Sequence, residues 1–190
     1  MANDAKQIKV ITPEALLSYP HFNEPRADDK GDLWYDCSLV FLPGTDLTAM
    51  KKAVLEAAQA KFGDKAAQMF KDGELKSPFR TDAKKKGYPE GSTFFSCKSK
   101  NKPGIVGVNP GKDGKPAAYT GELYAGLLVK ASIRPYYYKQ QGGGIAMGLG
   151  NVQVVGKGQR LDNRMDAADE FEADANAAAA GNSDGVDDLL

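Results

Sequence analysis

Residues 121–155, GELYAGLLVKASIRPYYYKQQGGGIAMGLGNVQVV, constrain the fold of this chain more than any other segment. From Leu127 to Tyr138, apolar residues alternate with polar or aromatic ones, which is the period-2 pattern of a half-buried strand. Three glycines, 142–144, follow. A second alternation then places Ile145, Met147 and Leu149 opposite alanine and glycine residues. The segment predicts two strands joined at a glycine hinge.

The polar face of the first predicted strand combines cations with aromatic rings. By alternation it carries Lys130, Ser132, Arg134, Tyr136 and Tyr138. Tyr137 then faces the core. Such a face suits unpaired nucleic-acid bases, and the nearly side-chain-free face of the second strand leaves room for a flat ligand or another backbone. The alternative is that the tyrosines are ordinary strand formers in an edge hairpin.

The second strand contains a change of parity. Its apolar positions are odd-numbered up to Leu149 but even-numbered at Val152 and Val154. If both sets face the core, an extra residue is inserted near Gly150–Asn151, which indicates a β-bulge. Bulges bend strands as small barrels require.

The remaining pattern is mainly β. Strands are predicted within residues 6–18, bent near Pro13, and over 32–42, with a loop at 18–32 between them. One main α-helix, about 46–62, is expected to be capped by Thr45 or Asp46 and ended by Gly63, and a short helix follows at about 64–70. These elements predict an OB-fold-like small barrel of about five strands with one main helix and long basic loops.

Three further residues of the predicted strands bear on the type of site. Trp34 falls on the outer face of strand 32–42, either as a stacking platform or, as we prefer, packed under a loop. Cys37 and Cys97 lie in predicted strands without nearby histidine or cysteine, so buried thiols are expected rather than a metal site. No cofactor is predicted.

Residues 71–102 supply a second group of candidate DNA contacts. The segment has nine basic and four acidic residues, with phenylalanine and tyrosine interleaved among the lysines, as an electrostatic groove with stacking positions requires. The candidate contacts here are Arg80, Lys84, Lys85, Lys86, Tyr88, Lys98, Lys100 and Lys102. The alternative is a solvated loop with Phe94 or Phe95 in the core.

Charge is segregated along the chain although the net charge is zero. Residues 166–190 contain eight acidic residues and no basic one, so residues 1–165 carry about +8. This division predicts a folded domain over 1–165 and a disordered acidic tail over 166–190. A basic body indicates a polyanion partner, and the tail is expected to compete for the same surface. The alternative is a solubilising tail.

Several protein classes are not expected. No apolar run approaches a membrane span and the N-terminus lacks a signal-peptide pattern, which predicts a cytoplasmic protein with no membrane partner. The glycine-rich stretches match neither a P-loop nor a dinucleotide fingerprint, and no catalytic constellation stands out. The chain is therefore not expected to be an enzyme and no catalytic residue is predicted.

The segments SCKSKNKPGIVGV, residues 122–155, GQRLDNR and AADEF resemble the phage single-stranded DNA-binding proteins long classed as a domain of unknown function. The matching hairpin positions are Tyr124, Gly126, Arg134, Tyr138, Gly144, Gly148, Leu149, Asn151, Val152 and Gln153. Gly150 departs from this pattern, in which asparagine is expected.

This resemblance implies an OB-fold with a helix that coats and protects single-stranded DNA, without sequence specificity, during phage replication, recombination and repair. It also implies that the tail recruits polymerase, helicase-primase or nuclease in the host cytoplasm, and a homodimer is left open. The candidate tail contacts are Phe171, Asp187, Asp188, Leu189 and Leu190. A phage structural or scaffolding protein is the alternative, and a DNA-processing enzyme is a third hypothesis.

Overall fold

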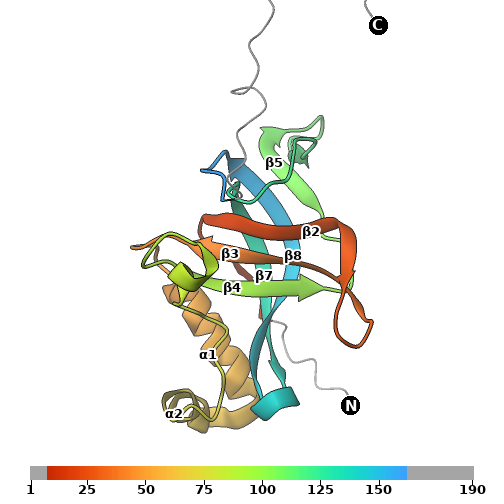
Figure 1. The fold of residues 1–190 in the computed structure, drawn as a ribbon. Helices are drawn as coiled ribbons and strands as arrows, with labels where there is room; N and C mark the ends of the chain where they lie inside the picture. Colours follow the sequence, from red (N-terminus) through yellow and green to blue (C-terminus); the bar gives the residue numbers. More distant parts are fainter. Residues whose placement is uncertain (1–7, 162–190) are drawn as a thin grey trace, which may run out of the picture.

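The computed structural model describes residues 8–161, which form eight strands and two α-helices (Figure 1). The strands are β1 Val10–Ile11, β2 Ala15–Ala27, β3 Leu33–Phe41, β4 Thr93–Ser99, β5 Ile105–Pro110, β6 Pro116–Ala118, β7 Leu128–Tyr138 and β8 Gly144–Gly156. The helices are α1 Thr48–Phe62 and α2 Ala66–Lys71, with short 3-10 turns at Gly63–Lys65, Ala83–Lys86 and Gln140–Gly142. The predicted β-rich class with one main helix is confirmed. No helix within residues 8–161 is long and apolar enough to cross a membrane.

Five of the strands close into a ring. Their order is β7, β2, β3, β4, β8 and back to β7, and β1, β5 and β6 extend the sheet beyond it. The β2–β7 and β4–β8 ladders contain two residue pairs each, and β4–β8 is parallel. The longer β7–β8 hairpin crosses β2, β3 and β4 in the view of Figure 1. The ring therefore has the five strands expected of the barrel, but it is closed by fewer residue pairs at β2–β7 and β4–β8 than at its other ladders.

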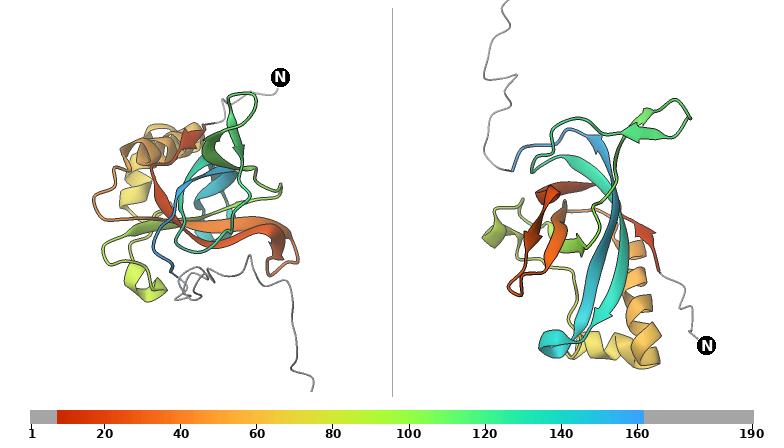
Figure 2. Two further views of the ribbon diagram at one scale, coloured as in Figure 1. Left: turned by 90° about the horizontal axis from the view of Figure 1, so that it is seen from above. Right: turned by 90° about the vertical axis from the view of Figure 1, so that its right-hand side faces the viewer.

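Helix α1 packs on the end of this hairpin. Its buried face consists of Met50, Ala53, Val54 and Ala58. At its end, the Phe62 ring meets the Tyr137 ring edge-on, with centroids 5.1 Å apart, so Tyr137 faces the helix as alternation predicts. Figure 2 shows α1 and α2 beside the part of the hairpin that extends past β4.

The ends of α1 lie close to their predicted positions. The helix begins at Thr48, whose backbone N–H donates to Asp46 Oδ1 at 2.9 Å, while Thr45 donates its hydroxyl back to the Leu42 carbonyl. Asp46 is therefore the residue that satisfies a free N–H of the first turn. The Thr48 bonds lower the pKa of Asp46. Gly63, with φ +59°, ends the helix as predicted.

The predicted loop at 18–32 is wrong over most of its length. Strand β2 continues to Ala27 and pairs with β3, and only Asp28–Asp32 form a turn, closed by a 2.8 Å bond from Asp28 N to the Asp32 carbonyl. Two register shifts interrupt the β2–β3 ladder between Ser18 and Arg26. Bulges of this kind accommodate prolines that break the sequence pattern of a strand.

The core has two parts, one on each face of β4. Phe95 and Cys97 lie in the main core, where the Cys97 Sγ is 3.4 Å from the Cys37 Sγ across the β3–β4 pair. Phe94 is buried in a smaller cluster with Tyr88. Adjacent residues do face opposite ways, but the segment around Ala83–Tyr88 covers the outer face, so both phenylalanines are buried rather than one.

The predicted bulge in β8 is confirmed. Ala131 pairs with Val152 and Ile133 pairs with Leu149, so β8 has one more residue than β7 between these pairs. The buried Ser132 side chain fills the irregularity, and its Oγ accepts the Asn151 N–H at 2.8 Å. A Cβ on Gly150 would lie 2.2 Å from this Oγ. Glycine at 150 therefore fits the bulge that this chain forms.

We expect Gly150→Ala to lower the free energy of unfolding by about 1–3 kcal/mol, because the methyl group displaces Ser132 and breaks its bond to Asn151. Gly156→Ala is a matched control in the same strand, since its Cβ would be in ordinary contact with the Leu128 side chain, at 3.7 Å from Cδ1 and 4.0 Å from Cβ. Urea unfolding measures both variants. Equal stability of the two would contradict the role assigned to Gly150.

Candidate nucleic-acid interface

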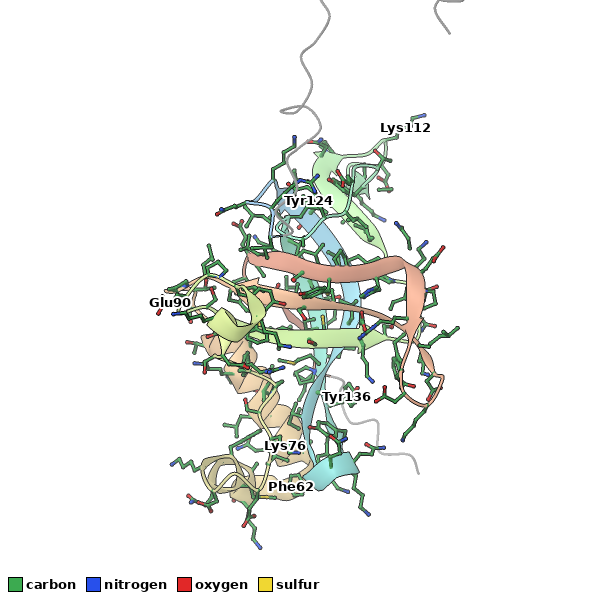
Figure 3. All side chains as sticks on the ribbon, viewed as in Figure 1. Phe62, Lys76, Glu90, Lys112, Tyr124 and Tyr136 are labelled. Atoms are coloured by element: carbon green, nitrogen blue, oxygen red, sulfur yellow. The ribbon has the colours of Figure 1, made fainter. Side chains whose placement is uncertain are left out.

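A groove of about 500 Å³ lies between the β2–β3 turn and the β7–β8 hairpin. Its lining residues are Asp28, Asp29, Lys30, Asp32, Trp34, Lys98, Tyr136, Tyr138, Gln140 and Ala146. Figure 3 shows Tyr136 on the hairpin beyond β4. The groove thus brings together Trp34 of β3, Lys98 of β4 and two tyrosines of β7, all of them predicted contacts.

The small residues of β8 make this arrangement sterically open. Gly148 pairs with Lys98 on one side and with Arg134 on the other, and Ala146 pairs with Tyr136. A row across three strands therefore carries two cations with a glycine between them. Because cross-strand partners share one face of a sheet, Lys98 and Arg134 lie on the same side as the groove.

Tyr136 presents part of its ring to solvent, with 40% of the residue exposed. Burial of the remainder, and then the nearby Tyr138, raise the pKa of the Tyr136 phenol. The group is therefore neutral at pH 7 and adds no negative charge to the groove. A neutral ring with an exposed face is a suitable platform for stacking a base.

Trp34 is packed under the turn and also lines the groove. Its Nε1–H donates to Asp28 Oδ2 at 3.0 Å, and the ammonium groups of Lys98 and Lys100 each lie 4.0 Å from its ring centroid. Cation–π contacts at such distances contribute about 0.5–1 kcal/mol at exposed sites. The preferred alternative, packing of Trp34 under a loop, is therefore what the structure shows, and the ring also lines the groove wall. A stacking role for Trp34 stays a prediction.

The acidic turn is a part of the site that the sequence analysis missed. Asp28, Asp29 and Asp32 all line the groove, and Asp32 Oδ1 accepts from Lys100 Nζ at 2.8 Å. The signal in the sequence is ADDKGD, which ends two residues before Trp34 and lies within the predicted loop 18–32. The carboxylates hold Trp34 and Lys100 in place and reduce the positive charge of the groove.

Asp36 lies beside Lys98 in register but is engaged elsewhere. Its two carboxylate oxygens contact His21 Nδ1 at 2.6 Å and Arg26 Nη2 at 2.8 Å. Lys98 consequently forms no ion pair with a described residue and is directed to the Trp34 ring. Among residues 8–161, no three His, Cys, Asp or Glu side chains gather as metal ligands.

Other predicted contacts lie outside the groove. Arg80 pairs with Asp82 and lies over the Phe94 ring, and Lys130 contacts Glu14 at 3.9 Å. Lys102 is exposed beyond β4 and does not line the groove. Lys84 and Lys86 are exposed on the Ala83–Lys86 turn and do not line the groove. The turn is close in sequence to Glu90, which lies at the left edge of Figure 3, apart from Tyr136 on the hairpin. The Lys85 side chain is not among those described.

The stacking role predicted for Tyr88 requires correction. Only 7% of Tyr88 is exposed, its ring packs edge-on against Phe94 at 5.0 Å, and its hydroxyl donates to Ser18 Oγ. The ring is therefore part of the smaller core cluster. The predicted tail contacts Phe171, Asp187, Asp188, Leu189 and Leu190 lie outside the described residues.

Comparison with known proteins places the chain among phage proteins. A family model described as "Enterobacter phage Enc34, ssDNA-binding protein" matches residues 8–181. No curated protein matches the chain in sequence.

Solved structures share the fold at low sequence identity. The single-stranded DNA-binding protein of bacteriophage Enc34, in complex with ssDNA, is 20% identical with a TM-score of 0.59, over 80% of this chain and 89% of that one. Its C-terminal truncation is 21% identical with a TM-score of 0.56, over 80% and 88%. The single-stranded DNA-binding protein gp2.5 of bacteriophage T7 is 16% identical with a TM-score of 0.54, over 87% and 98%.

We expect the bond between Trp34 and Asp28 to make the fluorescence of Trp34 depend on pH. This bond is the main cause that lowers the pKa of Asp28 below its ordinary value. Above the lowered pKa, the ionised carboxylate accepts the hydrogen bond from Trp34. As the pH falls through this pKa, the carboxylate is protonated and the bond is lost. Since Trp34 is the only tryptophan, we expect its emission to change on acidification with a midpoint below that of an ordinary aspartate.

Asp28→Asn should remove this transition, whereas Asp29→Asn, at the next position of the turn, should keep it. Far-UV circular dichroism over the same pH range controls for unfolding. A transition that survives in Asp28→Asn would assign it to another group.

Proposed function

The chain belongs to the family of Enterobacter phage Enc34 single-stranded DNA-binding proteins, and from this premise we propose that it binds single-stranded DNA in the groove between the β2–β3 turn and the β7–β8 hairpin. The binding is independent of sequence. Its role is to coat and protect single-stranded DNA during phage replication, recombination and repair, without enzymatic activity.

The observation that carries this proposal is the juxtaposition of Trp34, Tyr136 and Tyr138 with Lys98, which forms no ion pair with a described residue, in one groove. Bases stack on aromatic rings with about 1–3 kcal/mol each, and every base has a ring face, so such contacts tolerate any sequence. The pairing of Lys98 and Arg134 with Gly148 from either side supports contacts to successive phosphates. The open strip of β8 allows the strand to approach the sheet.

The acidic turn takes part in this binding as an internal competitor. Lys100 is held by Asp32 in the free protein, and an approaching phosphate competes for the same ammonium group. Exposed ion pairs contribute at most about 1 kcal/mol, so exchanging the Asp32 contact for a phosphate contact costs little. The turn therefore keeps the lysine positioned until DNA arrives.

Removing a groove contact should weaken binding to oligo-dT. We expect Tyr136→Ala to lower affinity by about 5- to 150-fold, because it removes one stacking platform. Lys98→Gln should weaken binding and reduce the slope of log K against log salt by about 0.7, the value for one phosphate contact on single strands. Titration of Trp34 fluorescence at several salt concentrations measures both effects.

Lys130→Gln is the matched control for Lys98→Gln, since Lys130 lies on β7 but outside the groove. It should leave the affinity and the salt slope nearly unchanged. Absence of oligo-dT binding by the unaltered protein at low salt would reject the proposal. A salt-independent oligomer that ignores DNA would instead favour a structural role in the phage particle.

We further propose that the acidic tail, residues 166–190, competes with DNA for the groove and recruits polymerase, helicase-primase or nuclease. The segregation of eight acidic residues behind a body of about +8 supports this role. When DNA occupies the groove, the tail's charge is displaced and becomes accessible to partners.

Deletion of residues 166–190 should tighten binding to oligo-dT, because a competing polyanion is removed. A full-length variant in which the eight acidic residues of the tail are replaced by Asn or Gln should behave like the deletion if charge is the cause. Affinities are compared at low and high salt, where the difference should shrink. Unchanged or weaker binding in the deletion would contradict competition by the tail.

A further inference from the structure

A second cavity, of about 720 Å³, lies on the helix side of the β7–β8 hairpin, between α1, α2 and residues 73–80. It shares no lining residue with the groove. Figure 3 shows Lys76, one of its lining residues, beside α1 and apart from Tyr136. Its volume is in the range of pockets that bind ligands or short peptide segments.

The walls of this cavity are apolar and fixed to the core. Val54 and Leu75 are buried, while Leu55, Phe70 and Phe79 are partly exposed toward the cavity that they line. Phe79 packs edge-on against the buried Phe95, with ring centroids 5.9 Å apart. Because its walls belong to the packed core, the cavity is preformed, which lowers the entropic cost of binding an apolar side chain.

The charged groups at this cavity are all cationic. Lys51, Lys76 and Arg80 line it, and none of its lining residues is acidic. Arg80 is paired with Asp82, but Lys51 forms no ion pair with a described residue and Lys76 donates only to the Gln141 carbonyl. The charge of Lys51 also contributes to lowering the pKa of Asp46, but neither Lys51 nor Lys76 forms an ion pair with a described residue. Two such ammonium groups beside an apolar hollow suit a segment that carries carboxylates next to apolar side chains.

Residues 184–190 of this chain, DGVDDLL, have that composition. They contain three carboxylates and three apolar side chains, Val186, Leu189 and Leu190, and the rest of the acidic tail offers only Phe171 as a large apolar side chain. We propose that residues 184–190 dock in this cavity, with leucine side chains against Val54, Leu55 and Phe79 and the aspartates facing Lys51 and Lys76.

The chain between the fold and this segment is long enough for docking within one molecule. Residues 162–183 span up to about 75 Å when extended, whereas a folded domain of this length has a radius of gyration of roughly 15 Å. A tether of this length corresponds to an effective concentration in the millimolar range. A peptide that binds only weakly as a free molecule is therefore largely docked when it is part of the same chain.

Docking at this cavity has a different consequence from competition at the groove. It involves residues 184–190 alone, so the five acidic residues between 166 and 174 are still available to compete with DNA for the groove. When docked, the segment that is proposed to recruit partners is withheld from them by the protein's own fold. This consequence for partners rests on the proposed recruitment by the tail, whereas the docking itself involves no nucleic acid and can be tested without DNA.

A nitroxide attached at Ser183→Cys of the full-length protein tests the docking. Cys37 and Cys97 are 2% and 1% exposed, so the label attaches selectively at position 183. In two-dimensional NMR spectra, we expect the amide signals of Leu55, Phe70 and Phe79 to broaden. The broadening should be independent of protein concentration and should be lost when Leu189 and Leu190 are both changed to Ser.

Lys51→Gln and Lys52→Gln form a matched pair on α1. Both remove one exposed lysine charge, but only Lys51 lines the cavity, so only Lys51→Gln should reduce the broadening, by at least two-fold. Broadening at Trp34 and Tyr136 instead would place the segment in the groove and overturn the inference. Broadening that disappears on dilution would assign the cavity to a second copy and overturn docking within one chain, and absence of broadening would overturn it altogether.

Discussion

The pairing of β7 with β8 across the bulge at Gly150–Asn151 is the interaction on which the rest of the structure depends. These two strands form one long ladder, and each also pairs with a different side of the remaining sheet, β7 with β2 and β8 with β4. The β2–β7 and β4–β8 ladders that close the ring contain only two residue pairs each, so both can form only if β8 bends. The buried Ser132 stabilises that bend, because its Oγ accepts the Asn151 N–H at the extra residue of β8.

The groove exists because β8, the second strand of this hairpin, has no large side chains where it borders the groove. Gly148 and Ala146 stand between the side chains of β4 and β7, and larger residues there would fill the space that the aromatic rings now border. The tyrosines and lysines thus share an open surface because of small residues on the intervening strand. Trp34 joins them from β3 only because the Asp28–Asp32 turn folds over it.

Two regions of the basic body, the groove and the cavity beside α1, differ in the carboxylates that lie near their positive charges. In the groove, aspartates of the β2–β3 turn already engage Trp34 and Lys100, which moderates the charge and positions both residues. Beside α1, Lys51 and Lys76 border an apolar cavity that contains no acidic lining residue. The total charge of the body therefore describes neither site, since each depends on which carboxylates the fold brings close.

The sequence by itself determined the features that depend on neighbours along the chain. The period of apolar residues identified the hairpin, the parity change at Leu149–Val152 located the bulge, and Gly63 marked the end of α1, because strand and helix periodicity are local properties. Only the tertiary structure decided which side chains meet. It buried Tyr88 against Phe94, continued β2 through its prolines, left Lys84, Lys86 and Arg80 outside the groove, and placed the aspartates of the β2–β3 turn within it. These outcomes rest on contacts between residues far apart in the chain, which no periodicity records.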